Sequence, residues 1–169
     1  MAISLGLLIL RIVAGLTLAA HGSQKLFGWF GGPGFNGTTG MMKSMRFEPN
    51  WLWALLAGLG EFAGGLLLAV GFLTPIGAIG IVGAMLMAIL KAHWQNGFWN
   101  SKRGYEFPLN LLVIALAIAI AGPGSYSIDA VIGFTLPIWL FIIGLVLAII
   151  VDIIGLLISR QQVVQESAA

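Results

Sequence analysis

Long apolar runs separated by shorter polar segments extend along almost the whole chain. Five runs stand out, at residues 3–20, 51–72, 76–93, 109–121 and 136–158. At a rise of 1.5 Å per residue, the second and fifth runs are long enough to cross a hydrocarbon core of roughly 30 Å. The pattern predicts an all-α fold, a polytopic membrane bundle of five helices.

The segments between the runs predict how the helices are arranged. Residues 73–75 and 122–129 make short connections, whereas residues 21–50 and 94–108 make long ones. Five spans therefore place both long connections and the C-terminus at one end of the bundle, the long-loop end. The N-terminus and the short connections lie at the other, the turn end. The fourth run is short, so we expect its helix to begin at Glu106, with Pro108 in the first turn, where a missing N–H is tolerated.

Composition agrees with a membrane protein and excludes several other classes. The chain has 169 residues, of which 59% are hydrophobic and only 8% are charged, against about 25% charged residues in an average soluble domain. So few charges cannot cover a soluble enzyme or a nucleic-acid-binding domain, and the net charge of +2 gives no reason to expect a nucleic-acid partner. The absence of cysteine excludes disulfides, thiolate metal sites and iron–sulfur clusters carried by this chain.

Basic residues gather at the long-loop end: Lys25, Lys43, Arg46, Lys91, Lys102, Arg103 and Arg160. The turn end carries no lysine or arginine, and its single charged residue is Asp129. The positive-inside rule then predicts that the long loops and the C-terminus are cytoplasmic and that the N-terminus is outside.

Two charged residues fall deep inside apolar runs. Arg11 lies eight residues into the first run and Glu61 ten residues into the second, which runs the opposite way. Both are expected near the midplane, where an unpaired charge is costly, so an Arg11–Glu61 pair is the economical prediction. Such a pair either fixes the helix register or takes part in function.

The other candidate site residues cluster at the long-loop end. His21 and Lys25 share a helix face if the first helix continues through them, while Lys91, His93 and Glu106 flank the second long connection. A cationic, aromatic pocket at the bilayer surface suits a flat, redox-active head group such as a quinone. The proposed catalytic residues, which relay protons or stabilise an oxyanion, are His21, Lys25, Glu61, His93 and Glu106. The proposed cofactor-binding residues are Arg11, Lys91, Trp94 and Phe98.

Other interpretations of the same residues compete with this one. Most of the aromatic residues are expected to form an interfacial belt, and the two histidines to be polar residues at a wet interface. A less favoured hypothesis is that His21 and His93 are the axial ligands of a b-type haem. Met41, Met42 and Met45 are more typical of the apolar face of a short interfacial helix than of a soft-metal site. No metal site is predicted.

Small residues recur along the predicted helices. Gly60 and Gly64 form a GxxxG motif in the second run, and Gly77, Gly80 and Gly83 follow in the third. In lipid, such residues allow helix backbones to approach closely, because packing replaces the hydrophobic driving force. Close packing within one bundle is a better interpretation than a dimer interface.

Several motifs, in order, resemble the DoxX family of small bacterial membrane proteins. The residues that carry the resemblance are 21–28 (HGSQKLFG), 31–38, 61–65 (EFAGG), 71–75 (GFLTP), 93–99 (HWQNGFW), 104–108 (GYEFP) and 122–129 (GPGSYSID). The resemblance covers roughly residues 5 to 130.

This resemblance implies a four-helix membrane bundle in the bacterial inner membrane and a redox context. Relatives include the DoxD-type subunit of thiosulfate:quinone oxidoreductase, and others are associated with oxidative-stress complexes. We therefore expect a DoxX-like domain at 1–130, an additional transmembrane helix at 131–160 and a polar tail at 161–169. The expected function is a quinone-interacting subunit of a larger membrane redox complex. A non-catalytic accessory subunit and, less favoured, a small-solute permease are the alternatives.

Overall fold

The computed structural model describes the backbone of residues 1–168 and the side chains of residues 1–160, and this part of the chain is helical without a strand. In chain order the elements are α1 (Ala2–Phe27), η1 (Trp29–Gly31), α2 (Gly34–Ser44), α3 (Asn50–Val70), α4 (Thr74–Met87), η2 (Ala88–His93), η3 (Trp94–Asn96), η4 (Asn100–Lys102), α5 (Glu106–Ala121), α6 (Ile128–Ile132) and α7 (Ile138–Ala168). The predicted all-α membrane bundle is confirmed.

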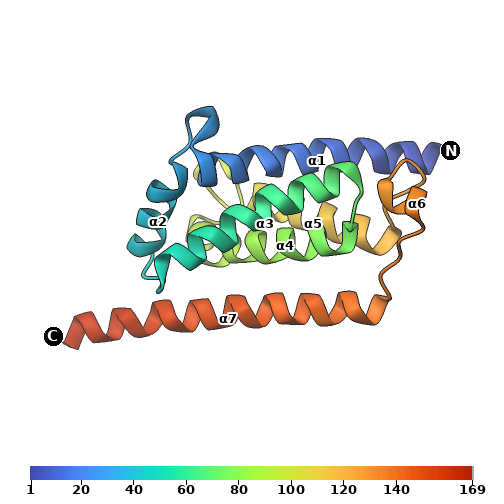
Figure 1. Ribbon diagram of the computed structural model, residues 1–169. Coiled ribbons are helices and arrows are strands. Elements are labelled where there is room, and N and C mark those ends of the chain that lie inside the picture. The colour runs from blue at the N-terminus through green and yellow to red at the C-terminus, as the bar shows by residue number, and fades with distance from the viewer. Residues whose placement is uncertain (169) are drawn as a thin grey trace.

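Five long helical segments run back and forth between the two ends of the molecule (Figure 1). Four of them are long and apolar enough to cross a membrane: Ala2–Phe27, Asn50–Val70, Thr74–Asn96 and Ile138–Arg160. The fifth, α5, has 16 residues and is about 24 Å long at 1.5 Å per residue. It begins at Glu106 with Pro108 in its first turn, as the sequence predicts. The backbone of α7 continues to Ala168, through most of the predicted polar tail, and residue 169 lies outside the described residues.

Helix α4 is the central element of the bundle, because α3, α5 and α7 all pack against it. Helix α1 packs mainly on α3, and α2 lies across the long-loop end of α1 and α3 (Figure 1). The main hydrophobic core joins α1, α3, α4, α5 and α7 through residues such as Leu18, Leu68, Ile81, Ile118 and Phe141. Helix α7 lies along one side of the bundle (Figure 1), and the apolar side chains on its other faces are exposed, as expected for a helix in lipid.

Glycines bring three helix backbones into direct contact, and the sequence predicts such packing for the second and third runs. A Cβ on Gly60 would lie 2.8 Å from the carbonyl oxygen of Gly80, so the GxxxG motif of α3 packs on α4. Between α1 and α3, Gly15 and Gly65 face each other, and a Cβ on either would lie 2.6 Å from the carbonyl oxygen of the other. These contacts fix the register of α1, α3 and α4 relative to one another.

At the turn end, a buried carboxylate links α6 to the start of α4 by hydrogen bonds. Asp129 in α6 accepts hydrogen bonds from the backbone N–H of Leu73 (2.7 Å) and of Thr74 (2.9 Å), and from the Thr74 hydroxyl (2.6 Å). Its own N–H donates to the carbonyl oxygen of Gly71 at 2.8 Å. A negative charge there satisfies the free N–H groups at the start of α4 and complements its helix dipole. Asp129 therefore has a structural role at the α3–α4 turn.

The predicted pairing of Arg11 with Glu61 is wrong. Arg11 is completely buried, and its Nη2 donates to the carbonyl oxygen of Tyr126 at 2.6 Å. Its guanidinium packs on Gly71, which follows the last turn of α3. Glu61 lies ten residues earlier on α3, about 15 Å along the axis. The register between α1 and α3 therefore places Arg11 at the turn end, away from Glu61.

A methyl group added between α1 and α3 tests this register. We expect Gly15→Ala to lower the free energy of unfolding by about 1–3 kcal/mol, because backbone atoms on α3 leave no space for the new Cβ. Gly6→Ala on the same helix is the matched control, since nothing lies within 4 Å of that Cβ. Thermal unfolding of the protein in detergent would measure both. Equal stability of the two variants would contradict the close contact.

Candidate functional site

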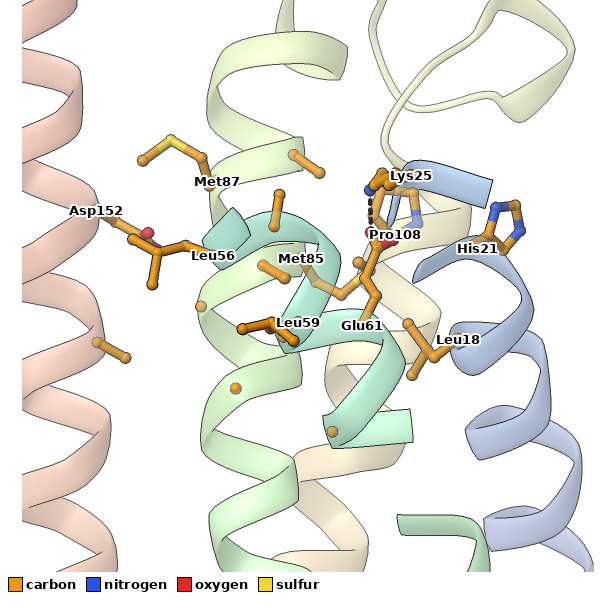
Figure 2. A pocket seen from close by; sticks show the side chains of 18 of the residues that line it. Leu18, His21, Lys25, Leu56, Leu59, Glu61, Met85, Met87, Pro108 and Asp152 are labelled. Carbon is orange, nitrogen blue, oxygen red and sulfur yellow. Dashed lines mark hydrogen bonds and ion pairs between the residues drawn. The ribbon is translucent and has the colours of Figure 1, made fainter. Parts of the chain in front are cut away.

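A cavity of about 720 Å³ lies among the helices toward the long-loop end. Side chains from α1, α3, α4, α5 and α7 line it (Figure 2). Met41 and Met42 of α2 line it as well. Its walls are mostly apolar and include leucines, methionines and the glycines of the α3–α4 contact. Within the bilayer, a space of this kind suits the apolar part of an amphiphilic ligand.

The main polar feature of the cavity is an ion pair between α1 and α3. Lys25 Nζ donates to Glu61 Oε1, and the two side chains are 23% and 4% exposed. Figure 2 shows the two groups meeting beside Pro108 of α5. Glu61 Oε2 is buried and accepts no hydrogen bond from any described residue. The pair thus presents one unused acceptor, the buried Glu61 Oε2.

Local structure explains why Lys25 reaches Glu61. Helix α1 continues through His21 and Lys25 to Phe27, and ends where Gly28 adopts a left-handed conformation with φ of 75°. Thr38 of α2 donates its hydroxyl to the carbonyl oxygen of Lys25 at 3.0 Å, which satisfies one free carbonyl at the end of α1. The glycine-rich segment after α1 therefore forms a helix that supports the site, and its Met41, Met42 and Met45 line the cavity.

A second group of polar residues lies between η2 and α7. Lys91 Nζ donates to the Ser159 hydroxyl at 2.8 Å and lies 5.6 Å from the centre of the Phe47 ring. Asp152 is 5% exposed, lines the cavity, and its Oδ2 has no hydrogen-bond partner among the described residues. In Figure 2, Asp152 points from α7 toward Leu56, while Glu61 and Lys25 lie on the other side of α3. The cavity therefore has two separate polar positions.

The two histidines also line the cavity, from different elements. His21 packs against Phe107 with ring centroids 5.4 Å apart, and His93 Nδ1 is 2.7 Å from the carbonyl oxygen of Arg103. Their roles as proton carriers or as haem ligands stay predictions. Among the described residues, no group of three or more histidine, aspartate or glutamate side chains is arranged to hold a metal ion.

Four of the predicted site residues do not line the cavity. Trp94 and Phe98 pack on Tyr105, with ring centroids 5.3 and 5.7 Å away, and Glu106 Oε2 accepts from the N–H of Asn100 at 2.9 Å. These three residues stabilise the conformation of the connection between η3 and α5. Arg11, the fourth, is bound at the turn end. The structure thus brings His21, Lys25, Glu61, Lys91 and His93 to one cavity, and Asp152, which the sequence places toward the same end in the fifth apolar run, lines it as well.

The aromatic wall of the cavity was not predictable from any local sequence pattern. Phe47 and Trp53 stack with centroids 5.0 Å apart, and Met42 completes their small buried cluster. The Trp53 ring lies directly on Gly155 of α7. A tryptophan in α3 and a glycine about one hundred residues later share no local pattern, so only the tertiary structure reveals their contact.

Comparison with known proteins places this fold in a family. The DoxX family model matches residues 6–94, which run from α1 to the start of η3. Inner membrane protein YqjF of Escherichia coli (strain K12) is 32% identical over 126 residues, which cover 73% of this chain and 89% of that relative. No solved structure matched the chain. With a family match over more than half of its length and this relative, the chain belongs to the DoxX family.

Proposed function

We propose that the protein is a membrane subunit that binds a quinone-class amphiphile, with the polar ring at the Lys25–Glu61 pair. The observation that carries this proposal is the apolar cavity of about 720 Å³ with one nearly buried ion pair in its wall. An apolar cavity with a few converging polar groups is the usual form of a small-molecule site. A quinone fits such a site because it joins a flat polar ring to a long apolar tail.

The residues of the ion pair have complementary roles in this proposal. The Lys25 ammonium has three N–H donors, of which Glu61 takes one, and can stabilise negative charge that develops on a ring oxygen. Glu61 can take up or release a proton through its open Oε2. His21 lies one helical turn before Lys25 and is exposed, which suits a group that exchanges protons with water.

Electrons would come from outside this chain. The side chains of the cavity bind and orient a head group and move protons, but they do not store electrons. We therefore propose that the protein works beside a redox partner in the inner membrane, the location that the name of the Escherichia coli relative indicates.

We also propose that the long-loop end faces the cytoplasm. Seven of the eight lysines and arginines lie at or near that end, which matches the positive-inside rule. The remaining one, Arg11, is buried and bound to Tyr126, so it is a poor topology signal.

Single cysteines would test this orientation directly, because the chain has no native cysteine. Ser101 at the long-loop end and Thr135 at the turn end are both exposed. On intact spheroplasts, we expect a membrane-impermeant maleimide to label Thr135→Cys and to label Ser101→Cys only after the membrane is opened. The reverse labelling pattern would show the opposite orientation.

Calorimetric titration would test the binding site. The purified protein, in nanodiscs made from quinone-free lipid, would be titrated with a short-chain ubiquinone analogue in its oxidised and in its reduced form. We expect saturable binding of at least one form, and about tenfold weaker binding of that form to Glu61→Gln because a buried charged acceptor is lost. Glu48→Gln is the matched control, since Glu48 is exposed and outside the cavity.

A double variant distinguishes weaker binding caused by loss of the polar site from weaker binding caused by unfolding of the protein. Lys25→Met with Glu61→Gln removes both charges together and so leaves no buried unpaired ion. We expect it to stay folded, with an unchanged melting profile in the empty nanodisc, and to bind weakly. Unaltered affinity in both Glu61→Gln and the double variant, or no saturable binding to the wild-type protein, would contradict the proposed function.

A further inference from the structure

Two carboxylate oxygens that line the cavity, Glu61 Oε2 and Asp152 Oδ2, are buried and have no hydrogen-bond partner among the described residues. Each of the two ammonium groups nearby uses one of its three N–H donors, Lys25 on Glu61 and Lys91 on Ser159. A buried acceptor without a donor is costly, so the occupant that suits this cavity brings an O–H or N–H group.

From this arrangement we infer that the site at Glu61 selects the reduced, hydroxyl-bearing form of its ligand over the oxidised, carbonyl form. The inference rests on the proposed function and deepens it by naming the redox state that the site recognises. A hydroquinone carries two ring hydroxyls, and one of them can donate to Glu61 Oε2. A quinone offers only carbonyl oxygens, which would bring an acceptor against an acceptor.

The Lys25 ammonium does not reverse this preference. It already donates to a carboxylate, and a charged acceptor makes a stronger hydrogen bond than a neutral carbonyl does. A carbonyl ligand would have to compete with Glu61 for that donor or use an N–H directed elsewhere. In either case Glu61 Oε2 would stay without a donor, whereas a hydroxyl satisfies it and leaves the ion pair intact.

Asp152 provides an internal comparison. It is a second buried carboxyl with an open oxygen, but it lies on the α7 side of α3, away from Lys25 (Figure 2). Because the ion pair holds Glu61 in place, the polar ring is assigned to the Glu61 side. The apolar tail then has the space beside Leu56 and Leu59, toward α7.

Three matched ligands would test the inference: a short-chain hydroquinone, its quinone, and its dimethyl ether, which keeps both ring oxygens but has no donor. Calorimetric titration would be carried out without oxygen, on the full-length protein in quinone-free nanodiscs. We expect the hydroquinone to bind at least about tenfold more tightly than either of the other two, the size of effect that a single buried hydrogen bond makes.

Single substitutions test whether the preference for hydroquinone over quinone depends on the Glu61 carboxyl. Glu61→Gln supplies an amide N–H as well as an oxygen, so we expect the preference for hydroquinone over quinone to fall below about threefold. Asp152→Asn and the exposed control Glu48→Gln should keep it.

Three outcomes would overturn the inference. They are equal or tighter binding of the quinone, a preference that persists in Glu61→Gln, and a preference lost only in Asp152→Asn. Saturable binding of both forms without a preference would leave the proposed function standing. Failure of every form to bind would remove the proposed function together with the inference.

Discussion

Close backbone contact between helices is the constraint on which the rest of this structure depends. In lipid, helices gain little from burying apolar side chains against one another, so packing at small residues determines where they meet. Gly15 meets Gly65 between α1 and α3, and Gly60 meets Gly80 between α3 and α4. Once these contacts are made, every other side chain on the three helices has a fixed neighbour.

The placement of the charges follows from that register. The same α1–α3 contact that aligns Gly15 with Gly65 carries Lys25 to Glu61 near one end and Arg11 to Gly71 near the other. Lys25 pairs with the Glu61 carboxylate, whereas the buried Arg11 donates a hydrogen bond from Nη2 to the carbonyl oxygen of Tyr126. The turn end is closed by Asp129 and Arg11, and the long-loop end keeps a cavity with an open carboxylate. The polar contacts that close the bundle and the cavity therefore lie toward opposite ends of the molecule.

Periodicity and composition were sufficient to predict the helices, their order between the two ends and the start of α5 at Glu106, because these depend on local sequence and on length. The partners of Arg11 and Glu61 were not predictable, because depth along separate helices says little about register. The sequence also placed Trp94, Phe98 and Glu106 at the expected pocket, but their contacts are within the connection between η3 and α5. There the backbone N–H groups of Tyr105 and Glu106 donate hydrogen bonds to the carbonyl oxygens of Gly97 and Phe98. Trp53 and Gly155 show the same limit, since their contact joins two helices that are distant in sequence.

Lys25 and Glu61 are proposed to form one polar site in which the free carboxylate oxygen accepts a hydrogen bond from a hydroxyl group of the ligand. Solid-state NMR of the protein in lipid bilayers, with ¹⁵N-labelled lysine and ¹³C-labelled glutamate, measures it directly. We expect a strong dipolar coupling between a lysine Nζ and a glutamate carboxyl carbon that disappears in Glu61→Gln. Adding a short-chain hydroquinone should shift that carboxyl resonance, whereas its dimethyl ether should not. No such coupling in the wild-type protein, or a carboxyl resonance that responds equally to both ligands, would show that this polar site does not exist as proposed.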